Sequence, residues 1–215
     1  MRGLLLTMTE PPLAMEEEFN AWYDTEHLPE RLAIPGFRSA RRWVCPDAGP
    51  GEGKYLATYE LDSPEVLTTP EYLAHVGDHF TPWSKRCLGR ATLFRRWAAG
   101  ETGRAHDTLA VPADQEARAL FISLGDIPPG HEAEFNRWYD EEHVPLISQV
   151  PGVLRARRFF DPAGKPRYVA LYDLAGPQAR HHPDWQKAVA TPWTQRIRGY
   201  QAGVERLVRT YLAYS

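Results

Sequence analysis

The residues best suited to chemistry in this sequence are an adjacent glutamate and histidine within EFNAWYDTEHLPERLAIPGFRSARRW, Glu18–Trp43. Glu26 and His27 each lie four residues after an aromatic side chain, Trp22 and Tyr23. Residues four apart are neighbours on a helix, so both groups would lie beside aromatic rings. A carboxylate and an imidazole in such a setting can act as general acid and general base. The segment therefore predicts proton-transfer chemistry on a small molecule.

The same segment occurs twice. EFNRWYDEEHVPLISQVPGVLRARRF, Glu134–Phe159, aligns with the first copy without a gap over 26 positions at a constant offset of 116 residues. The counterparts of the residues above are Trp138, Tyr139, Glu142 and His143. Composition alone does not produce such agreement, so the chain is interpreted as a tandem duplication. We expect a first repeat over 1–98, a linker over the Gly-, Ala- and Asp-rich stretch 99–116, and a second repeat over 117–215.

Apolar residues at helical period indicate a helix over Ala14–Leu28, which Pro29 should end because a proline disfavours the helical conformation in the residue before it. At about 100° per residue from Met15, Glu26 falls at about 20°, in the middle of the aromatic stripe. His27 falls at about 120°, at the edge of that stripe. The wheel therefore predicts that Glu26 is buried and hydrogen-bonded, as is its counterpart in the second copy.

Two interpretations of the glutamates stay open at this point. A carboxylate among aromatic rings loses hydration, which raises its pKa unless a donor such as the neighbouring histidine, Tyr23 or Arg41 compensates. Such a group can work with the histidine as an acid–base pair. Alternatively, Glu26 and Glu142 accept hydrogen bonds from the backbone or from an arginine near the helix end and fix the turn into Pro35-Gly36. The tryptophans are more suited to packing or to a pocket wall than to chemistry.

The second helix distinguishes the copies. The first reads PEYLAHVGDHFTPW, from Pro70, and the second PDWQKAVATPW, three residues shorter. The additional length brings His75 and His79, which would share a helical face if the helix continues across Gly77. With His27 they could bind a metal or haem or transfer protons, or they are solvated histidines at a frayed helix end. The principal site is accordingly expected in the first copy.

The candidate residues follow from these patterns. Candidate catalytic residues are His27, Glu26, Tyr23, His75, His79, His143 and Glu142. Candidate substrate-binding residues are Trp22, Arg41, Tyr72, Trp83, Trp138, Tyr139 and Trp193. HExxH, CxxC, a nucleotide-binding glycine loop and GxSxG do not occur, so neither a metal ligand set nor an organic cofactor is expected.

Period-two strands surround the helices and set the fold class. The first copy predicts strands over Gly3–Thr9, Phe37–Val44, Lys54–Leu61 and Ala91–Trp97, with a second helix over Pro70–Phe80 that TPW either kinks or restarts. The second copy repeats this βαββαβ order, which is the ferredoxin-like α+β arrangement with an antiparallel sheet and both helices on one face. The uncovered sheet faces could then pack against each other as a pseudo-dimeric α+β barrel within one chain.

Composition limits the classes of binding partner that are expected. A net charge of −3 gives no reason to expect nucleic acid, and the longest N-terminal apolar run, Leu4–Leu6, is too short for a signal peptide or membrane span. Cys45 and Cys87 lie at non-equivalent places in the repeat and are interpreted as free thiols of a reducing cytoplasm. The expected partner is a small molecule; a homodimer is compatible with the sequence but not required by it.

WYDTEHLP…PGF and WYDEEHVP…PGV, each followed by a YLATYEL-like strand and a TPW segment, resemble the dimeric α+β-barrel superfamily, and within it the EthD-like branch. The resemblance covers nearly the whole chain, twice. It implies a cofactor-independent enzyme, such as an isomerase, cyclase, dehydratase or monooxygenase, on an apolar or aromatic metabolite. It also leaves a haem-binding barrel open, and a non-catalytic ligand-binding or scaffold protein remains a third hypothesis.

Overall fold

The computed structural model describes residues 1–103 and 116–212. Contacts divide the chain into two compact units, the first formed by Met1–Gly100 with Leu212 and the second by Glu101–Tyr211. Of the expected linker 99–116, the first residues belong to strand β4, Leu93–Glu101, and residues 104–115 lie outside the described residues.

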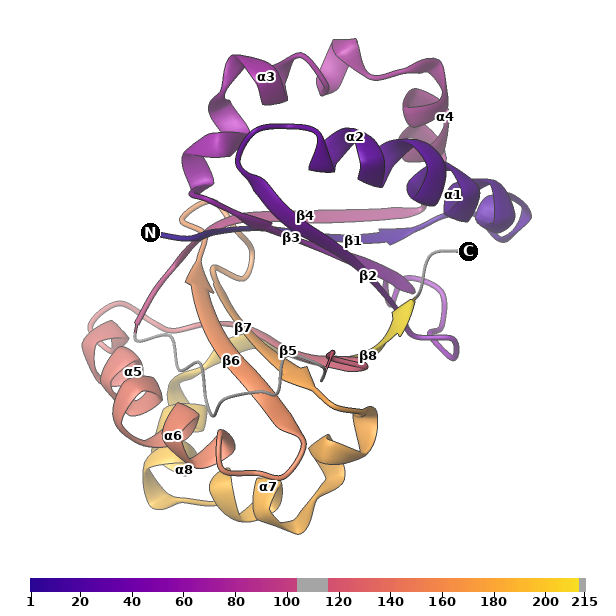
Figure 1. Cartoon of the computed structure of the whole chain (residues 1–215). Coiled ribbons are helices and arrows are strands. Elements are labelled where there is room, and N and C mark those ends of the chain that lie inside the picture. The colour runs from indigo at the N-terminus through magenta and orange to yellow at the C-terminus, as the bar shows by residue number, and fades with distance from the viewer. Residues whose placement is uncertain (104–115, 213–215) are drawn as a thin grey trace. The chain divides into compact units, whose positions relative to one another are not determined.

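The first unit is an antiparallel sheet covered on one face by helices (Figure 1). Its other strands are β1, Gly3–Glu10, β2, Phe37–Val44, and β3, Tyr55–Leu61. β1 pairs with β3 and β4, and β3 pairs with β2, which gives the order β4-β1-β3-β2. This is the ferredoxin-like α+β order that the sequence predicts for one repeat.

The second unit has the same order of elements. Its strands are β5, Ala119–Asp126, β6, Val153–Phe160, β7, Tyr168–Leu174, and β8, Ala202–Leu212. β5 pairs with β7 and β8, and β7 pairs with β6, all antiparallel. Both halves of the chain thus carry an antiparallel α+β fold. No helix of the described residues is long and apolar enough to cross a membrane.

The first helical segment is longer than predicted and is not a regular α-helix. It runs through α1, Glu16–Trp22, a π turn, Tyr23–His27, and α2, Leu28–Leu32. In the π turn the amide of Leu28 donates to the carbonyl of Tyr23, five residues back instead of four. The second unit repeats this with α5, Glu132–Trp138, the turn Tyr139–His143, and α6, Val144–Ile147.

The prediction that Pro29 ends the helix is therefore wrong. Pro29 lies in the first turn of α2, directly after the π turn. A proline in a helix interior removes one i→i−4 bond and clashes with the carbonyl four residues back, but in a first turn it is tolerated. The π turn has already interrupted the i→i−4 ladder, so the chain stays helical to Leu32.

The predicted second helix is also divided. α3 covers only Pro70–Leu73, and α4, Pro82–Arg90, starts anew at TPW. Thr81 caps α4, its side-chain oxygen accepting from the amide of Ser84 at 3.0 Å. Gly77 between the helices has a φ of 62°, a conformation that breaks a helix. Thr191 caps α8, Pro192–Tyr200, in the same way, after α7, Pro183–Ala188.

Candidate functional site

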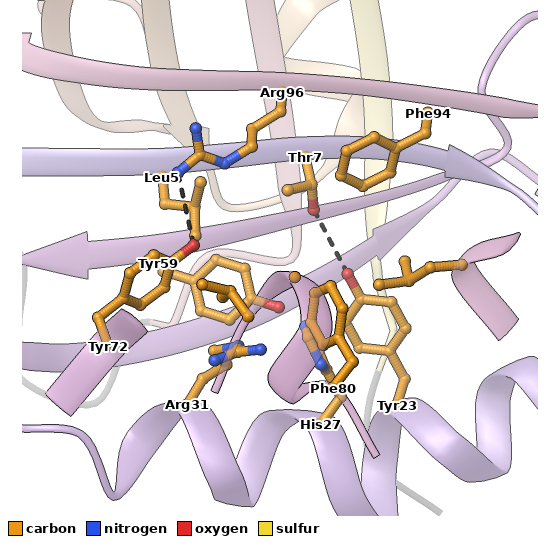
Figure 2. Close-up of a pocket in the computed structure, with 13 residues that line it drawn as sticks. Leu5, Thr7, Tyr23, His27, Arg31, Tyr59, Tyr72, Phe80, Phe94 and Arg96 are labelled. Carbon is orange, nitrogen blue, oxygen red and sulfur yellow. Dashed lines mark hydrogen bonds between the residues drawn. The ribbon is translucent and has the colours of Figure 1, made fainter. Parts of the chain in front are cut away.

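The first unit contains a cavity of about 470 Å³ between its helices and its sheet. Figure 2 shows side chains of the first helical segment facing side chains of the strands across it. The cavity is lined by Leu5, Thr7, Tyr23, His27, Arg31, Tyr59, Tyr72, Val76, Gly77, Phe80, Leu88, Phe94 and Arg96. Its volume lies in the range of small-molecule sites.

The π turn decides which helical residues reach this cavity. Tyr23, His27 and Arg31 line it from the helix, whereas Glu26 does not. A wheel drawn at α-helical pitch puts Glu26 at the centre of the buried face and His27 at its edge. The additional residue of a π turn rotates the following side chains back by about one position. His27 therefore takes the place that the sequence assigned to Glu26.

His27 is buried, with 8% of its surface exposed, and its Nδ1 has no hydrogen-bond partner among the described residues. Its ring lies 4.5 Å from the Trp22 ring and 5.0 Å from the Tyr23 ring, centre to centre. Burial lowers the pKa of His27 well below its usual value, and the positive charges of Arg31 and Arg42 lower it further. The imidazole is neutral at physiological pH.

Two tyrosines and a threonine supply hydroxyl groups to the lining of the same cavity. The hydroxyls of Tyr23 and Thr7 are 3.3 Å apart. The buried hydroxyl of Tyr59 makes no hydrogen bond of ordinary geometry within the described part of the chain. Burial raises the pKa of Tyr59 well above its usual value, as does the nearby Tyr23, so the phenol keeps its proton.

Arg31 also lines the cavity, although it was not among the candidate site residues. It is 2% exposed, and its Nη2 donates to the carbonyl of His75 at 2.8 Å and lies 3.6 Å from a carboxylate oxygen of Glu30. Tyr59 and Arg96 were missed as well. Spacing could have found Arg31, because it follows Tyr23 and His27 at intervals of four residues.

The glutamates of the repeat connect helices instead of facing the cavity. Glu26 is half-buried, and its Oε1 accepts from Trp22 Nε1 at 3.1 Å, from Thr81 Oγ1 at 2.6 Å and from Ser84 Oγ at 3.1 Å. Glu142, also half-buried, accepts from Thr191 Oγ1 at 2.6 Å. The hydrogen bonding follows the sequence prediction, but the donors differ and burial is incomplete. The bonds agree with a structural role, but the donors are side chains of Trp22, Thr81, Ser84 and Thr191 and not the backbone or arginine that the structural alternative named.

Arg41 does not reach the helix; Arg42 does. A bulge between Phe37 and Ser39 shifts the strand alternation by one residue, which turns Arg42 toward the helical face. Arg42 Nη1 donates to Asp24 at 2.7 Å, and its guanidinium lies 4.5 Å from the Tyr23 ring centre. Arg41 lies over the Trp43 ring instead.

The predicted histidine cluster does not form. His75 lies behind Arg31, its Nδ1 2.8 Å from Glu30 Oε1, and His79 is exposed outside the cavity lining. The reason is that the helix is interrupted: α3 ends at Leu73 and Gly77 has a positive φ, so His75 and His79 do not share a helical face. Within residues 1–103 and 116–212 no group of three His, Cys, Asp or Glu side chains could hold a metal ion.

Of the predicted aromatic pocket walls, only Tyr72 lines the large cavity. Trp22 is buried, with its Nε1 donating to Ser84 at 3.0 Å, and Trp83 donates to Glu18 at 3.1 Å. In the second unit, Trp138 and Tyr139 line the smaller cavity, and Trp193 lies beside Arg137. These tryptophans mostly pack helices.

The second unit holds only about 30 Å³ at the equivalent place. Trp185 stands at the position of Tyr72, and Phe121 at that of Leu5. The guanidinium of Arg180 lies 5.0 Å and 4.9 Å from the ring centres of Phe121 and Trp185. These larger groups fill the space. His143 remains, with its Nδ1 unpartnered among the described residues and its pKa lowered to about 3, chiefly by burial.

We expect Glu26→Gln to lower the melting temperature without changing ligand binding in the large cavity. The variant keeps a carbonyl acceptor but loses the charge that strengthens three hydrogen bonds, a loss of about 1–3 kcal/mol. Glu142→Gln is the matched control and should cost less, because one such bond is found there. Thermal unfolding and ligand titration measure the two effects; weakened binding at unchanged stability would contradict the structural role.

Both buried histidines should make stability fall in acid. Each is neutral in the folded state but binds a proton in the unfolded state below about pH 6.5. The unfolding free energy is therefore fully present above that pH and falls by up to about 1.4 kcal/mol per pH unit for each histidine as the pH drops. For His143 the loss continues toward its folded pKa of about 3.

Urea unfolding between pH 7 and pH 4 measures this dependence. His143→Gln should flatten it relative to the unmodified chain, whereas His79→Gln, at an exposed site, should not. Equal slopes for all three proteins would show that the histidine is not buried neutral.

Comparison with protein-family models and with curated protein sequences gave no match. Solved structures are similar over nearly the whole chain. A chlorite dismutase from Candidatus Nitrospira defluvii, in complex with imidazole, is 6% identical with a TM-score of 0.64, covering 99% of this chain and 92% of that one. An anthrone oxidase-like protein is 14% identical with a TM-score of 0.62 (98% and 90%). A ferredoxin-fold protein related to antibiotic biosynthesis monooxygenases, from Listeria monocytogenes, is 11% identical with a TM-score of 0.52 (100% and 96%). The chain shares the fold of these proteins.

Proposed function

We propose that the first unit is a small-molecule enzyme that binds an apolar or aromatic metabolite in its large cavity and transforms it by acid–base chemistry without an organic cofactor. The observation that carries the proposal is a cavity lined by aromatic and aliphatic side chains, in which the neutral imidazole of His27 has an Nδ1 without a hydrogen-bond partner among the described residues, as does the nearby hydroxyl of Tyr59. Buried polar groups are normally paired, and each exception calls for an explanation. A bound molecule supplies the partner.

The chemistry proposed for this cavity is removal and return of a proton. The His27 imidazole accepts a proton from an acidic C–H or O–H of the bound molecule, and the bonding electron pair stays on that molecule. The Tyr59 hydroxyl and the Arg31 guanidinium stabilise the negative charge that results. Return of the proton to another atom of the bound molecule gives an isomerisation. Transfer of the proton from His27 to a departing hydroxyl releases water and leaves a double bond, which is a dehydration. Attack of the electron-rich carbon on a carbonyl carbon of the same molecule, whose oxygen then takes up the proton, gives a cyclisation.

The fold supports this class of function by analogy only. Neighbours described as anthrone oxidase-like and as related to monooxygenases keep a monooxygenase reaction among the candidates. The EthD-like motif of the repeat supports the same branch. Glu26 and Glu142 have structural roles in this proposal, and the second unit carries no comparable site.

The repeat also supports a duplicated origin for the two units, with their sheets packed against each other as a pseudo-dimeric barrel. The expected result is a single compact particle in small-angle scattering of the purified chain, because sheet-to-sheet packing buries both apolar faces. A scattering profile of two separated lobes would contradict the barrel.

The decisive comparison for function is His27→Gln against His143→Gln. A ligand co-purified with the protein, identified by mass spectrometry, or a panel of aromatic compounds supplies the substrate. We expect His27→Gln to lower kcat by about 10²–10⁴-fold, as is usual for loss of a general base, with binding changed little. His143→Gln should retain activity, provided that it folds.

Three other outcomes are informative. Equal losses from both variants, or a loss from His143→Gln alone, would place the chemistry elsewhere. Tight binding with no turnover would identify a binding protein. A Soret band in the visible spectrum of the purified protein would instead indicate haem.

A further inference from the structure

The large cavity of the first unit has positively charged side chains in its lining, of which Arg31 is buried and Arg96 is exposed. Its described lining contains two arginines, Arg31 and Arg96, and no aspartate or glutamate. His27 contributes no charge to the cavity, since its lowered pKa keeps it neutral. An apolar cavity with this charge disfavours a cation and favours an anion.

Arg31 has unused hydrogen-bonding capacity. Its Nη1 is buried without a hydrogen-bond partner among the described residues, whereas its Nη2 already donates to the His75 carbonyl and lies 3.6 Å from Glu30. Glu30 is shared with His75, whose Nδ1 lies 2.8 Å from its other oxygen. One side of the guanidinium is thus held by the protein, and the other has no partner among the described residues although Arg31 lines the cavity.

Aromatic rings surround this guanidinium. Its central carbon lies 5.5 Å from the ring centre of Tyr72 and 5.9 Å from that of Phe80. Phe94, which is 50% exposed, also lines the cavity from β4, and Figure 2 shows it across from Tyr23 and Phe80. A flat ring is the shape that aromatic walls bind best.

Resting on the function proposed for this cavity, we infer that its ligand is a planar aromatic carboxylate, with the carboxylate bound by Nη1 of Arg31 and the ring among the aromatic walls. A carboxylate fits better than a phosphate, because a single buried guanidinium nitrogen is free and Arg96 Nη2 already lies 3.5 Å from the Tyr72 hydroxyl. Arginine–carboxylate pairs are short, charge-assisted hydrogen bonds.

The second unit supports the assignment by contrast. The position of Arg31 is occupied there by Ile147, and the cavity shrinks to about 30 Å³. Tyr139, His143 and Tyr172 keep the positions of Tyr23, His27 and Tyr59. Loss of the arginine therefore accompanies loss of the space for a ligand. The smaller cavity is lined by arginines of its own, Arg180, Arg198 and Arg206, so it is the lack of space and not a lack of positive charge that excludes an aromatic carboxylate there.

The test compares two flat ligands of nearly the same shape, 2-naphthoate and 2-naphthamide, by calorimetric titration of the full chain. We expect the acid to bind roughly 10- to 100-fold more tightly than the amide, which corresponds to the net value of a hydrogen bond to a charged group. Arg31→Met should remove this preference, and Arg31→Lys should restore part of it. Arg90→Met, at an exposed position on α4, is the matched control and should leave the preference unchanged.

A second readout is the His27 titration followed by NMR. The acid should raise the pKa of His27 relative to the free protein, because its charge offsets that of Arg31, and the amide should not.

The outcomes separate this inference from the function on which it rests. Equal affinity of the unmodified chain for acid and amide would overturn carboxylate recognition while leaving the cavity as a ligand site. Failure of both compounds to bind a correctly folded chain would count against the inference and against the proposed function of the cavity together. The comparison of acid and amide on the unmodified chain decides the question even if Arg31→Met does not fold.

Discussion

The π turn at Tyr23–His27 is the constraint on which the site depends. A single additional residue in the helix changes which side chains face the sheet, because everything after the turn rotates by about one position. His27 and Arg31 thereby face the cavity, and Glu26 faces α4. The same turn makes room for Pro29 in a continuing helix. A regular α-helix with this sequence would put a carboxylate in the cavity in place of the imidazole.

Two arginines near the π turn are each bound by acceptor groups of the protein. Arg42 is bound by Asp24 on the far side of Tyr23, and Arg31 by Glu30 and the His75 carbonyl. Burial is the main cause of the lowered pKa that keeps His27 neutral, and both arginines lower this pKa further through space. A neutral imidazole can accept a proton at any pH near neutrality, although a low pKa makes it a weak base. A bound anion would raise that pKa, so ligand charge and base strength are coupled.

The two units show how one scaffold can keep or lose a cavity. Their element order, their π turns and their buried histidines are the same. The units differ in the side chains between helices and sheet, where Trp185 and Arg180 occupy space that the first unit leaves empty. Because packed interiors have few voids, a cavity of about 470 Å³ lined by aromatic rings is a feature that packing by itself does not produce. Function on such folds resides in the site and not in the scaffold.

The sequence by itself determined the strands and the sheet order of each unit. Strand alternation is a local pattern and the internal repeat is visible by comparing the sequence with itself. The strand β2 has the bounds that the alternation predicts. It also identified His27 and Tyr23 as candidates, because their types and spacing are visible in one dimension. The segment Pro70–Phe80 was predicted less well from the sequence, since the helix expected there ends at Leu73.

Only the tertiary structure decided the orientation of these side chains. A π turn and a β-bulge each change the register by one residue, which replaces Glu26 by His27 and Arg41 by Arg42, and neither irregularity has a sequence period. The same holds for Arg31, whose importance comes from burial and from an unpartnered nitrogen. Burial and hydrogen-bond satisfaction are properties of the packed chain, because they depend on residues far apart in sequence.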